Sequence, residues 1–266
     1  MPLFSIITIN YNNREGLEKT VESVLSQTSK QFEYIVIDGG SDDGSKEFIQ
    51  SKSDRITYWV SEKDRGIYHA MNKGIAAATG TYCLFLNSGD SLANPQVLDK
   101  VETTGLSTEI LYGEVVFDRG AGNQKIAPVP EKPNLEYLFG DNIWHPSTFI
   151  KRSLFDEYGS YNETYSVAAD YDFFFHVLAI KEVSSVPLHF PVSIHVVDGV
   201  SSRPENMDRI RQERERIHKA YLSQAMIDSL NKLTVLNRSG AVKFGRWLEN
   251  KPLLKRAASF FFRFHA

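Results

Sequence analysis

The feature that most constrains the fold is a pattern repeated through the first third of the chain: a short apolar run, a polar cluster, then a helical pattern. The apolar runs, rich in β-branched and aromatic residues as buried strands are, lie at 4–9, 32–37, 56–60 and 82–86. Helical spacing follows at Leu17, Val21 and Val24, around 46–51, and over 67–78. Strands that alternate with helices form βαβ units, so the chain predicts an α/β fold with a mostly parallel sheet flanked by helices.

Polar clusters follow each of these apolar runs, at 10–12, 38–43, 62–64 and 87–90. Ligands of open α/β sheets bind beyond the carboxyl ends of the strands. Turns favour Asn, Asp, Ser and Gly for conformational reasons alone, so any one cluster has a plain structural explanation. Four clusters in succession at one edge of a sheet favour a binding cleft.

The middle of the chain has a less regular pattern. We expect strands and a loop over 110–142, with a hairpin turn at 120–123. Helical character is expected over 149–178, and further strands at 183–186 and 192–197.

Charge divides the chain into two parts. From Arg203 onward there are 14 Lys and Arg against 6 Asp and Glu, a balance of +8, and since the whole chain carries −3 the first 202 residues carry −11. We therefore expect a catalytic domain at 1–202 and a basic helical C-terminal extension at 203–266, with a helix over 207–222. An acidic body does not fit nucleic-acid binding.

Targeting signals and disulfides are not expected. No run of about 18 apolar residues suggests a transmembrane helix, and residues 1–5 lead into a strand pattern without the basic start of a signal peptide. The single cysteine, Cys83, lies in an apolar run and excludes an intrachain disulfide. These features predict a cytoplasmic protein.

Five motifs give the chain its resemblance to a known family. They are SIITINYN at 5–12, VIDGGSDDGS at 36–45, DRGIYHAMNKGI at 64–75, FLNSGD at 85–90 and ADYD at 169–172. In this order and spacing the chain resembles the inverting family 2 glycosyltransferases of the GT-A fold, especially those of bacterial surface-polysaccharide synthesis. The resemblance covers about residues 3–202.

The resemblance implies an enzyme that moves a sugar from a nucleotide diphosphate sugar, a UDP-sugar in our prediction, to a hydroxyl of a glycan or lipid-linked acceptor. It places the nucleotide base at Asp38, whose carboxylate could accept the imide N–H of uracil. Tyr11 could pack on the base or ribose. Both have structural alternatives, a turn aspartate and a core-edge aromatic. The other candidate donor-binding residues are Thr8, Asn10, Glu62, Asp64, Asn72, Asn87, Ser88, Asp90 and His145.

Asp90 is the predicted diphosphate and metal residue. A divalent cation, Mn²⁺ or Mg²⁺, held by a carboxylate would stabilise the charge that develops on the leaving diphosphate. Relatives commonly carry Asp-x-Asp here, whereas this chain has Asn87-Ser88-Gly89-Asp90, which leaves one acid. His195 is a second candidate ligand for the metal or phosphate. The structural alternative for Asp90 is a helix N-cap.

Asp170 matches the family's catalytic base, which takes the proton of the acceptor hydroxyl as inversion proceeds. The preceding position, an acid in many relatives, is Ala169 here. An acidic residue at a helix start is the structural alternative. His145 lies in a segment that borders the acceptor pocket in relatives and could bind acceptor or phosphate.

The basic and aromatic segment 253–264 could lie in a membrane interface near anionic lipid, or pack on protein. Two other functions stay open at this point. A nucleotidyltransferase would normally carry a Gly-rich phosphate loop after the first strand, which 10–14 is not. A noncatalytic nucleotide-sugar module would fit the reduced acidic motif but not the presence of Asp170.

Overall fold

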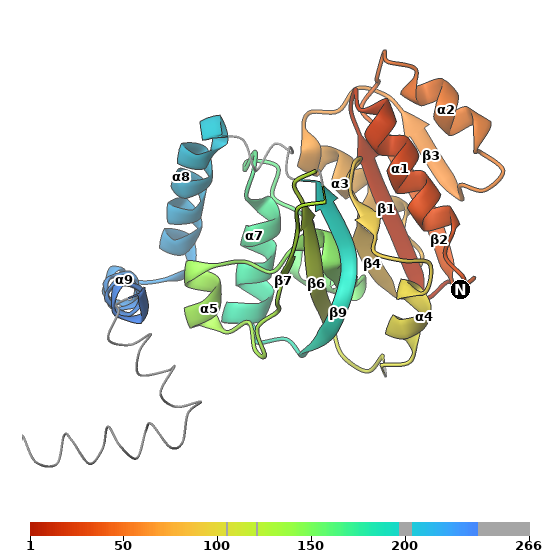
Figure 1. Ribbon diagram of the computed structural model, residues 1–266. Helices are drawn as coiled ribbons and strands as arrows, with labels where there is room; N and C mark the ends of the chain where they lie inside the picture. Colours follow the sequence, from red (N-terminus) through yellow and green to blue (C-terminus); the bar gives the residue numbers. More distant parts are fainter. Residues whose placement is uncertain (105, 121, 197–203, 239–266) are drawn as a thin grey trace, which may run out of the picture. The chain divides into compact units, whose positions relative to one another are not determined.

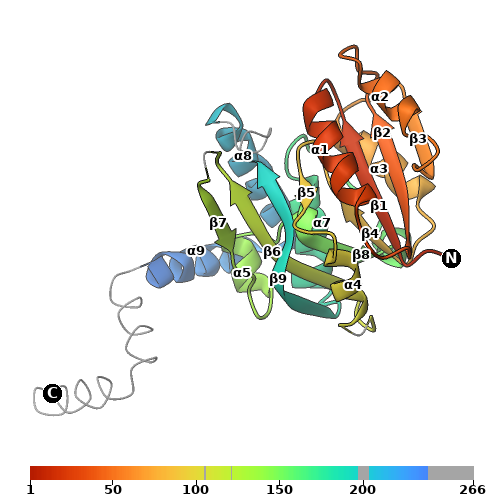
Figure 2. The ribbon, with the colours of Figure 1, turned by 45° about the vertical axis from the view of Figure 1, so that its right-hand side comes forward.

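Strand β1 (Phe4–Asn10) lies inside a twisted sheet, parallel to both of its neighbours, β2 (Phe32–Asp38) and β4 (Tyr82–Phe85). The computed structural model in Figures 1 and 2 describes residues 1–266 except 105, 121, 197–203 and 239–266. The chain divides into two compact units, Met1–Ile217 and His218–Ala266. The sheet belongs to the first unit.

The parallel half of the sheet has the order β3 (Tyr58–Ser61), β2, β1, β4. Its register places Asn10 opposite Asp38, and Asp38 opposite Ser61. The strands predicted in the first third of the chain are confirmed within two residues at each end. The carboxyl ends of these strands therefore lie at one edge of the sheet, as predicted from the polar clusters that follow them.

Helices cover both faces of this half because side chains alternate along each strand. Ile6 and Tyr34 point to the face that packs under α1 (Arg14–Leu25) and α2 (Ser45–Ser51). The opposite face packs on α3 (Ile67–Ala77), where a β-carbon on Gly74 would lie 2.4 Å from Cγ2 of Ile7. Only glycine allows so close an approach.

The other half of the sheet is mostly antiparallel. After β4 the order continues β8 (Thr148–Lys151), β6 (Ile110–Asp118), β9 (Ser185–Val196) and β5 (Ser91–Leu92), and β7 (Gln124–Ala127) pairs with β6. Only β6 and β9 are parallel to each other here. The predicted α/β fold is confirmed, with parallel pairing concentrated in the N-terminal half. The predicted hairpin turn joins β6 to β7, with positive φ at Gly120 and Gly122.

Two predictions of secondary structure were wrong in detail. Helical character was expected from 149, but Thr148–Lys151 is strand β8, because its backbone pairs with β4 on one side and β6 on the other. Helices begin later, as α6 (Ser153–Tyr158) and α7 (Ala169–Phe174), which continues as the π-helical turn η2 (Phe175–Ile180). The two strands expected between 183 and 197 form one strand, β9. Pro187 and Pro191 inside it interrupt the apolar pattern.

The remaining helices are short or C-terminal. They are α4 (Val97–Glu102), α5 (Leu135–Gly140), the 3-10 turn η1 (His145–Ser147), α8 (Pro204–Tyr221) and α9 (Gln224–Arg238). Among the helices in the described ranges, none is long and apolar enough to cross a membrane. Segment 253–264, predicted to contact a membrane or protein, lies outside the described residues.

Candidate active site

Asp38, at the end of β2, organises the first part of the site. Its side chain is fully buried, and its two oxygens accept hydrogen bonds from Asn10 Nδ2 at 2.7 Å, Ser41 Oγ at 2.6 Å, Ser61 Oγ at 2.6 Å and the Ser41 backbone N–H at 3.0 Å. Burial alone would raise the pKa of Asp38, but the bonds from Ser41, Ser61 and Asn10 outweigh it and lower the pKa below its ordinary value. The carboxylate thus ties the ends of three strands together.

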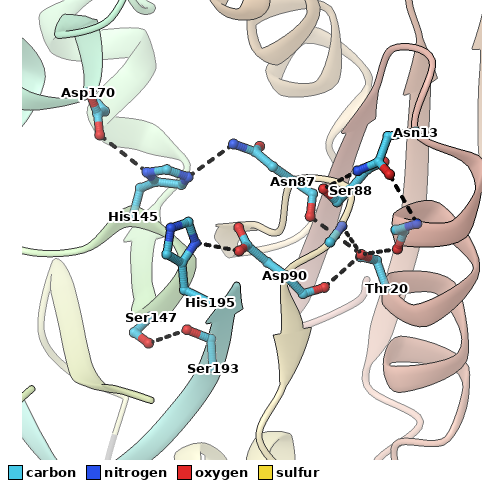
Figure 3. A network of polar contacts seen from close by, with 12 residues as sticks. Asn13, Thr20, Asn87, Ser88, Asp90, His145, Ser147, Asp170, Ser193 and His195 are labelled. Atoms are coloured by element: carbon cyan, nitrogen blue, oxygen red, sulfur yellow. Dashed lines mark hydrogen bonds and ion pairs between the residues drawn. The ribbon is translucent and has the colours of Figure 1, made fainter. Parts of the chain in front are cut away.

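The loop 87–90 lies beside this strand end. Ser88 Oγ donates to Asn10 Oδ1 at 2.6 Å, so Asn10 joins the loop to Asp38. Thr20 on α1 fixes the loop through two hydrogen bonds. Its hydroxyl accepts from the Gly89 N–H at 3.0 Å and donates to the Asp90 carbonyl at 2.6 Å (Figure 3). Gly89 has φ +107°, a conformation that side chains disfavour.

Asp90 and His195 contact each other directly. Asp90 Oδ1 lies 2.6 Å from His195 Nδ1, with the two side chains 6% and 17% exposed (Figure 3). Phe117 packs on the imidazole in a T-shaped arrangement, with ring centroids 5.8 Å apart. The two predicted metal ligands are therefore brought together from β9 and the loop after β4. Within the described ranges, no group of three or more His, Cys, Asp or Glu could hold a metal.

Asp170, at the start of α7, is joined to the loop 87–90 through His145. Asp170 Oδ2 lies 3.2 Å from His145 Nδ1, and His145 Nε2 lies 3.3 Å from Asn87 Nδ2 (Figure 3). Tyr68 on α3 donates its hydroxyl to Asp170 Oδ1 at 2.9 Å. Burial alone would raise the pKa of Asp170, but the hydrogen bond and charge of His145, with the bond from Tyr68, lower it. The predicted base thus stays ionised.

A third cluster follows β3. Lys73 contacts Asp64 Oδ1 at 2.6 Å and Glu62 at 3.0 Å, and His69 Nδ1 lies 2.9 Å from the same Asp64 oxygen. Asp64 Oδ2 is buried, and no residue in the described part of the chain hydrogen-bonds it. Tyr11, by contrast, is 70% exposed. An exposed aromatic ring near the strand ends is suited to packing on a flat ligand.

Comparison with known proteins bears on what this arrangement does. Residues 5–127 match the family described as glycosyl transferase family 2. An uncharacterized glycosyltransferase of Mycobacterium tuberculosis is 35% identical over 188 residues, which are 68% of this chain and 71% of the relative. The chain belongs to glycosyltransferase family 2. It is therefore an enzyme of glycosyl transfer, which disfavours the nucleotidyltransferase and noncatalytic alternatives.

A second relative is similar in sequence, and two solved structures are similar in fold. A PGL/p-HBAD biosynthesis glycosyltransferase of Mycobacterium bovis is 34% identical over 179 residues, 65% of this chain and 68% of that one. Residues 1–349 of TarS from S. aureus, solved with UDP-GlcNAc, align with 86% of this chain and 70% of theirs at a TM-score of 0.64 and 16% identity. A mannosyltransferase of Pyrobaculum calidifontis, solved with GDP-Man and Mn²⁺, aligns with 91% of this chain and 82% of its own at a TM-score of 0.57 and 14% identity. The shared fold is the GT-A fold.

Two of the predicted donor-binding residues of this glycosyltransferase lie apart from the others. Thr8 is fully buried under α1, where its hydroxyl lies 3.0 Å from that of Tyr34. Asn72 on α3 exchanges hydrogen bonds with the backbone of Tyr161, at 2.9 and 3.0 Å, and donates to Glu163. Thr8 thus faces the core, and Asn72 fixes the loop that leads to α7.

Sequence reasoning assigned no role to Tyr68, Thr20 or His69. Tyr68 lies in one of the family motifs, but its contact with Asp170 spans 102 positions and needs the fold to be seen. Thr20 has no motif signal, because a buried threonine on an amphipathic helix looks like any other core-facing residue.

Proposed function

We propose that this glycosyltransferase transfers a sugar, with inversion, from a UDP-sugar to a hydroxyl of a glycan or lipid-linked acceptor in cell-surface polysaccharide synthesis. The observation that carries the proposal is the linkage of two pairs, Asp90–His195 and Asp170–His145, through one loop at the edge of the sheet. The pair Asp90–His195 would serve the diphosphate of the donor, and the pair Asp170–His145 would take the proton of the acceptor hydroxyl. The UDP-GlcNAc complex of TarS and the PGL/p-HBAD biosynthesis glycosyltransferase of Mycobacterium bovis support the choice of donor and acceptor class.

The donor would bind along the strand ends. Tyr11 offers its exposed ring to the base or ribose, and Asn10, Ser88 and Asn87 offer polar groups to the ribose and diphosphate. Asp38, the predicted base-reading residue, would act by holding Asn10 and Ser41, since its four hydrogen bonds occupy both oxygens. Contact of Asp38 with a uracil N–H requires one of these bonds to be exchanged. Glu62 and Asp64 would shape the wall formed by the loop after β3.

A divalent cation, Mn²⁺ or Mg²⁺, fits Asp90 and His195. One carboxylate and one imidazole are ligands that Mn²⁺ accepts, and such a cation keeps substrate phosphate and water in its remaining positions. When bound, it would neutralise charge on the leaving diphosphate. The Mn²⁺ complex of the archaeal mannosyltransferase supports the choice of metal.

The transfer needs a proton acceptor on the acceptor side. As the acceptor oxygen forms its bond to the anomeric carbon, the bond to the diphosphate oxygen breaks and the hydroxyl proton must leave. We assign this proton to the centre formed by Asp170 and its partner His145. Asp170 is 14% exposed and hydrogen-bonded on both oxygens, so its position is fixed before substrate binds.

We assign catalysis to residues 1–202 and an accessory role to the basic extension 203–266. A cytoplasmic location is part of the proposal.

The lone Cys83 is buried, which raises the pKa of its thiol to about 12 and makes it inert.

Thermal unfolding with a panel of UDP-, GDP- and dTDP-sugars, each with and without Mn²⁺, tests the proposal. We expect a UDP-sugar to raise the Tm most, and Mn²⁺ to increase that shift, because a ligand that binds only the folded state stabilises it. Absence of a shift with every nucleotide sugar would contradict the proposed donor class. A shift without release of nucleoside diphosphate, with or without acceptor, would contradict the proposed reaction.

A further inference from the structure

Trp144 presents an aromatic ring to solvent beside the candidate active site. It is 39% exposed and lies in the loop 141–144, between α5 and η1. Tryptophan is highly buried on average. Among the described residues, the other exposed Phe, Tyr or Trp side chains are Tyr11, assigned to the nucleotide, and Tyr58 on the edge strand β3. Of the three, Trp144 offers the largest apolar face.

The indole of Trp144 is held in place by its neighbours. It packs on Phe117 of β6 in a T-shaped arrangement, with ring centroids 4.9 Å apart and the planes at 79°. The backbone is fixed as well, because the Trp144 carbonyl accepts the Ser147 N–H at 3.0 Å and the Thr148 hydroxyl at 2.8 Å. A ligand that packs on a ring already fixed by the protein does not have to order it, so binding costs less conformational entropy.

Trp144 is connected to both acid–histidine pairs of the site. Phe117, on which the indole packs, also packs on His195, with ring centroids 5.8 Å apart. Along the chain, Trp144 directly precedes His145, whose Nδ1 lies 3.2 Å from Asp170 Oδ2. Figure 3 shows the two imidazoles directed at their carboxylates. The indole therefore lies next to the place where the sugar is transferred in the proposed reaction.

The position of the indole favours the acceptor over the nucleotide. Tyr11, the exposed ring suited to the nucleotide, follows β1 in the parallel half of the sheet, whereas Phe117 lies on β6 in the mostly antiparallel half. The acceptor hydroxyl has to reach Asp170. Asp170 and His145 keep 14% and 20% of their side chains exposed, so a ligand can contact both. The part of the acceptor that carries this hydroxyl therefore lies near Trp144.

A sugar ring fits a surface of this kind. Pyranoses carry C–H groups on one face, which pack on the electron-rich face of an aromatic ring, and hydroxyls at the rim, which bond polar groups. Small-molecule sites commonly combine an aromatic wall with a few polar groups that fix orientation. The indole of Trp144 supplies the wall, and Asp170 and His145 supply polar groups beside it.

We propose that Trp144 binds the acceptor, and that the acceptor presents a sugar ring whose C–H face packs on the indole while one of its hydroxyls faces Asp170. The inference rests on the proposed function and narrows its acceptor to a glycan or a glycosylated lipid. Asp170 takes the proton of that hydroxyl as the oxygen bonds to the anomeric carbon, and the diphosphate leaves with the electrons of the broken bond. Trp144 acts on acceptor binding and takes no part in the proton transfer.

Acceptor kinetics test the proposal, with the UDP-sugar selected by the thermal panel. The acceptor probes are the methyl glycosides of glucose, galactose, mannose, rhamnose and N-acetylglucosamine. For the glycoside that is glycosylated fastest, we expect Trp144→Ala to raise the acceptor KM about tenfold or more, the effect of losing a tryptophan that anchors a ligand. The kcat should change less than about threefold, and the Kd of the UDP-sugar less than about twofold, because only acceptor binding is lost.

Two further variants control this measurement. Trp144→Phe should recover part of the lost affinity, because a smaller aromatic face remains. Tyr58→Ala removes an exposed ring from the edge strand β3 and should leave the acceptor KM unchanged. An acceptor KM within about twofold of the unmodified enzyme in Trp144→Ala would overturn the proposal. An equal loss of donor affinity would also overturn it, since the indole would then serve the donor sugar.

The same assay distinguishes failure of this inference from failure of the proposed function. Release of UDP in water, with no methyl glycoside glycosylated, would contradict an acceptor that presents a sugar ring and would leave the donor reaction intact. Absence of UDP release from every UDP-sugar would count against the proposed function itself.

Tryptophan fluorescence provides a second measurement, which does not depend on turnover. Methyl glycosides carry no chromophore that overlaps with tryptophan. With UDP bound, we expect the accepted glycoside to change the emission of the unmodified enzyme but not that of Trp144→Phe, which keeps an aromatic ring against Phe117. The same change in both proteins, or no change in either, would overturn the contact between the sugar and Trp144.

Discussion

The imidazole of His195 reaches Asp90 across 105 positions of sequence, with Nδ1 2.6 Å from Oδ1. Asp90 belongs to the loop after β4, and His195 lies near the C-terminal end of β9. The contact therefore joins the parallel half of the sheet to the mostly antiparallel half. The single acid left in the motif thus gains a nitrogen partner from elsewhere in the chain. In the proposed mechanism, this pair would hold the divalent cation through one oxygen and one nitrogen.

The Asp90–His195 pair should control the response to metal. We expect Asp90→Asn to remove the additional stabilisation that Mn²⁺ gives to the donor complex, and His195→Ala to weaken it, because each loses a ligand. The measurement is the Tm with donor as Mn²⁺ is titrated. Asp156→Asn, whose carboxylate is 70% exposed at an ion pair with Arg152, is the matched control. An unchanged Mn²⁺ response in Asp90→Asn would remove Asp90 from the metal site.

Asp170→Asn should separate binding from chemistry. Asparagine keeps the size of the side chain but lacks the carboxylate that would take the proton of the acceptor hydroxyl. We expect donor affinity to persist and transfer to fall by about 10²–10⁴-fold. Calorimetric titration of donor and measurement of nucleoside diphosphate release, on the same preparation, check the two parts. Unchanged turnover would take Asp170 out of the mechanism.

Glu33 should make folding stability depend on acid pH. Its buried carboxylate accepts from Ser5 Oγ at 2.6 Å, the Thr79 N–H and hydroxyl at 2.5 and 2.8 Å, and the Gly80 N–H at 3.0 Å. Burial alone would raise the pKa of Glu33, but these bonds lower it. A folded-state pKa below the unfolded value of about 4.3 stabilises the fold above that value, and the stabilisation is lost as pH falls through the folded pKa.

Glu33→Gln should therefore lower the free energy of unfolding at pH 7 by about 1–3 kcal/mol. The difference from the unmodified protein should narrow as the pH falls below about 4, where the native carboxyl also becomes neutral. Urea unfolding at several pH values measures both effects. A difference that stays constant across this range would show that the charge of Glu33 does not matter.

Glu213 on α8 should support the segment before Asp170. Its two carboxylate oxygens accept the backbone N–H groups of Ser166, Val167 and Ala168 at 2.8, 3.0 and 3.0 Å. Glu213→Ala leaves these donors unpaired, so we expect a loss of about 1–3 kcal/mol in stability and a lower rate of transfer. Glu215→Ala, at an exposed position of the same helix, is the control and should change neither. Equal effects of the two variants would contradict a specific role for Glu213.

Much of the parallel half of the sheet was predictable because its signals are local. Residues such as Ile6, Val36 and Leu84 stand in short apolar runs, and the Asn, Asp and Gly that follow each run mark the strand ends. The later strands were less predictable. Residues 148–151 form a strand only because β4 and β6 leave a place for it, which is a tertiary effect on a short apolar segment.

The candidate site was predictable in its residue types but not in its contacts. Asp90, His145, Asp170 and His195 were each named from motifs, yet their pairing depends on the fold. Asp38 illustrates the limit: its position at a strand end suggested a ligand, whereas its four internal bonds give it a structural task first. The predicted domain boundary at residue 202 was based on the change in net charge along the chain. Net charge cannot predict the contacts that Glu213 and Arg214 make with residues 138–171.

The most direct test of inverting sugar transfer is proton NMR of the first sugar released from an α-linked UDP-sugar, with water as acceptor and Mn²⁺ present. Inversion predicts that the β anomer forms first, together with UDP, and that the α anomer grows in only by later equilibration. Initial release of the α anomer would contradict inversion, and the absence of UDP release from every UDP-sugar tried would contradict the proposed donor.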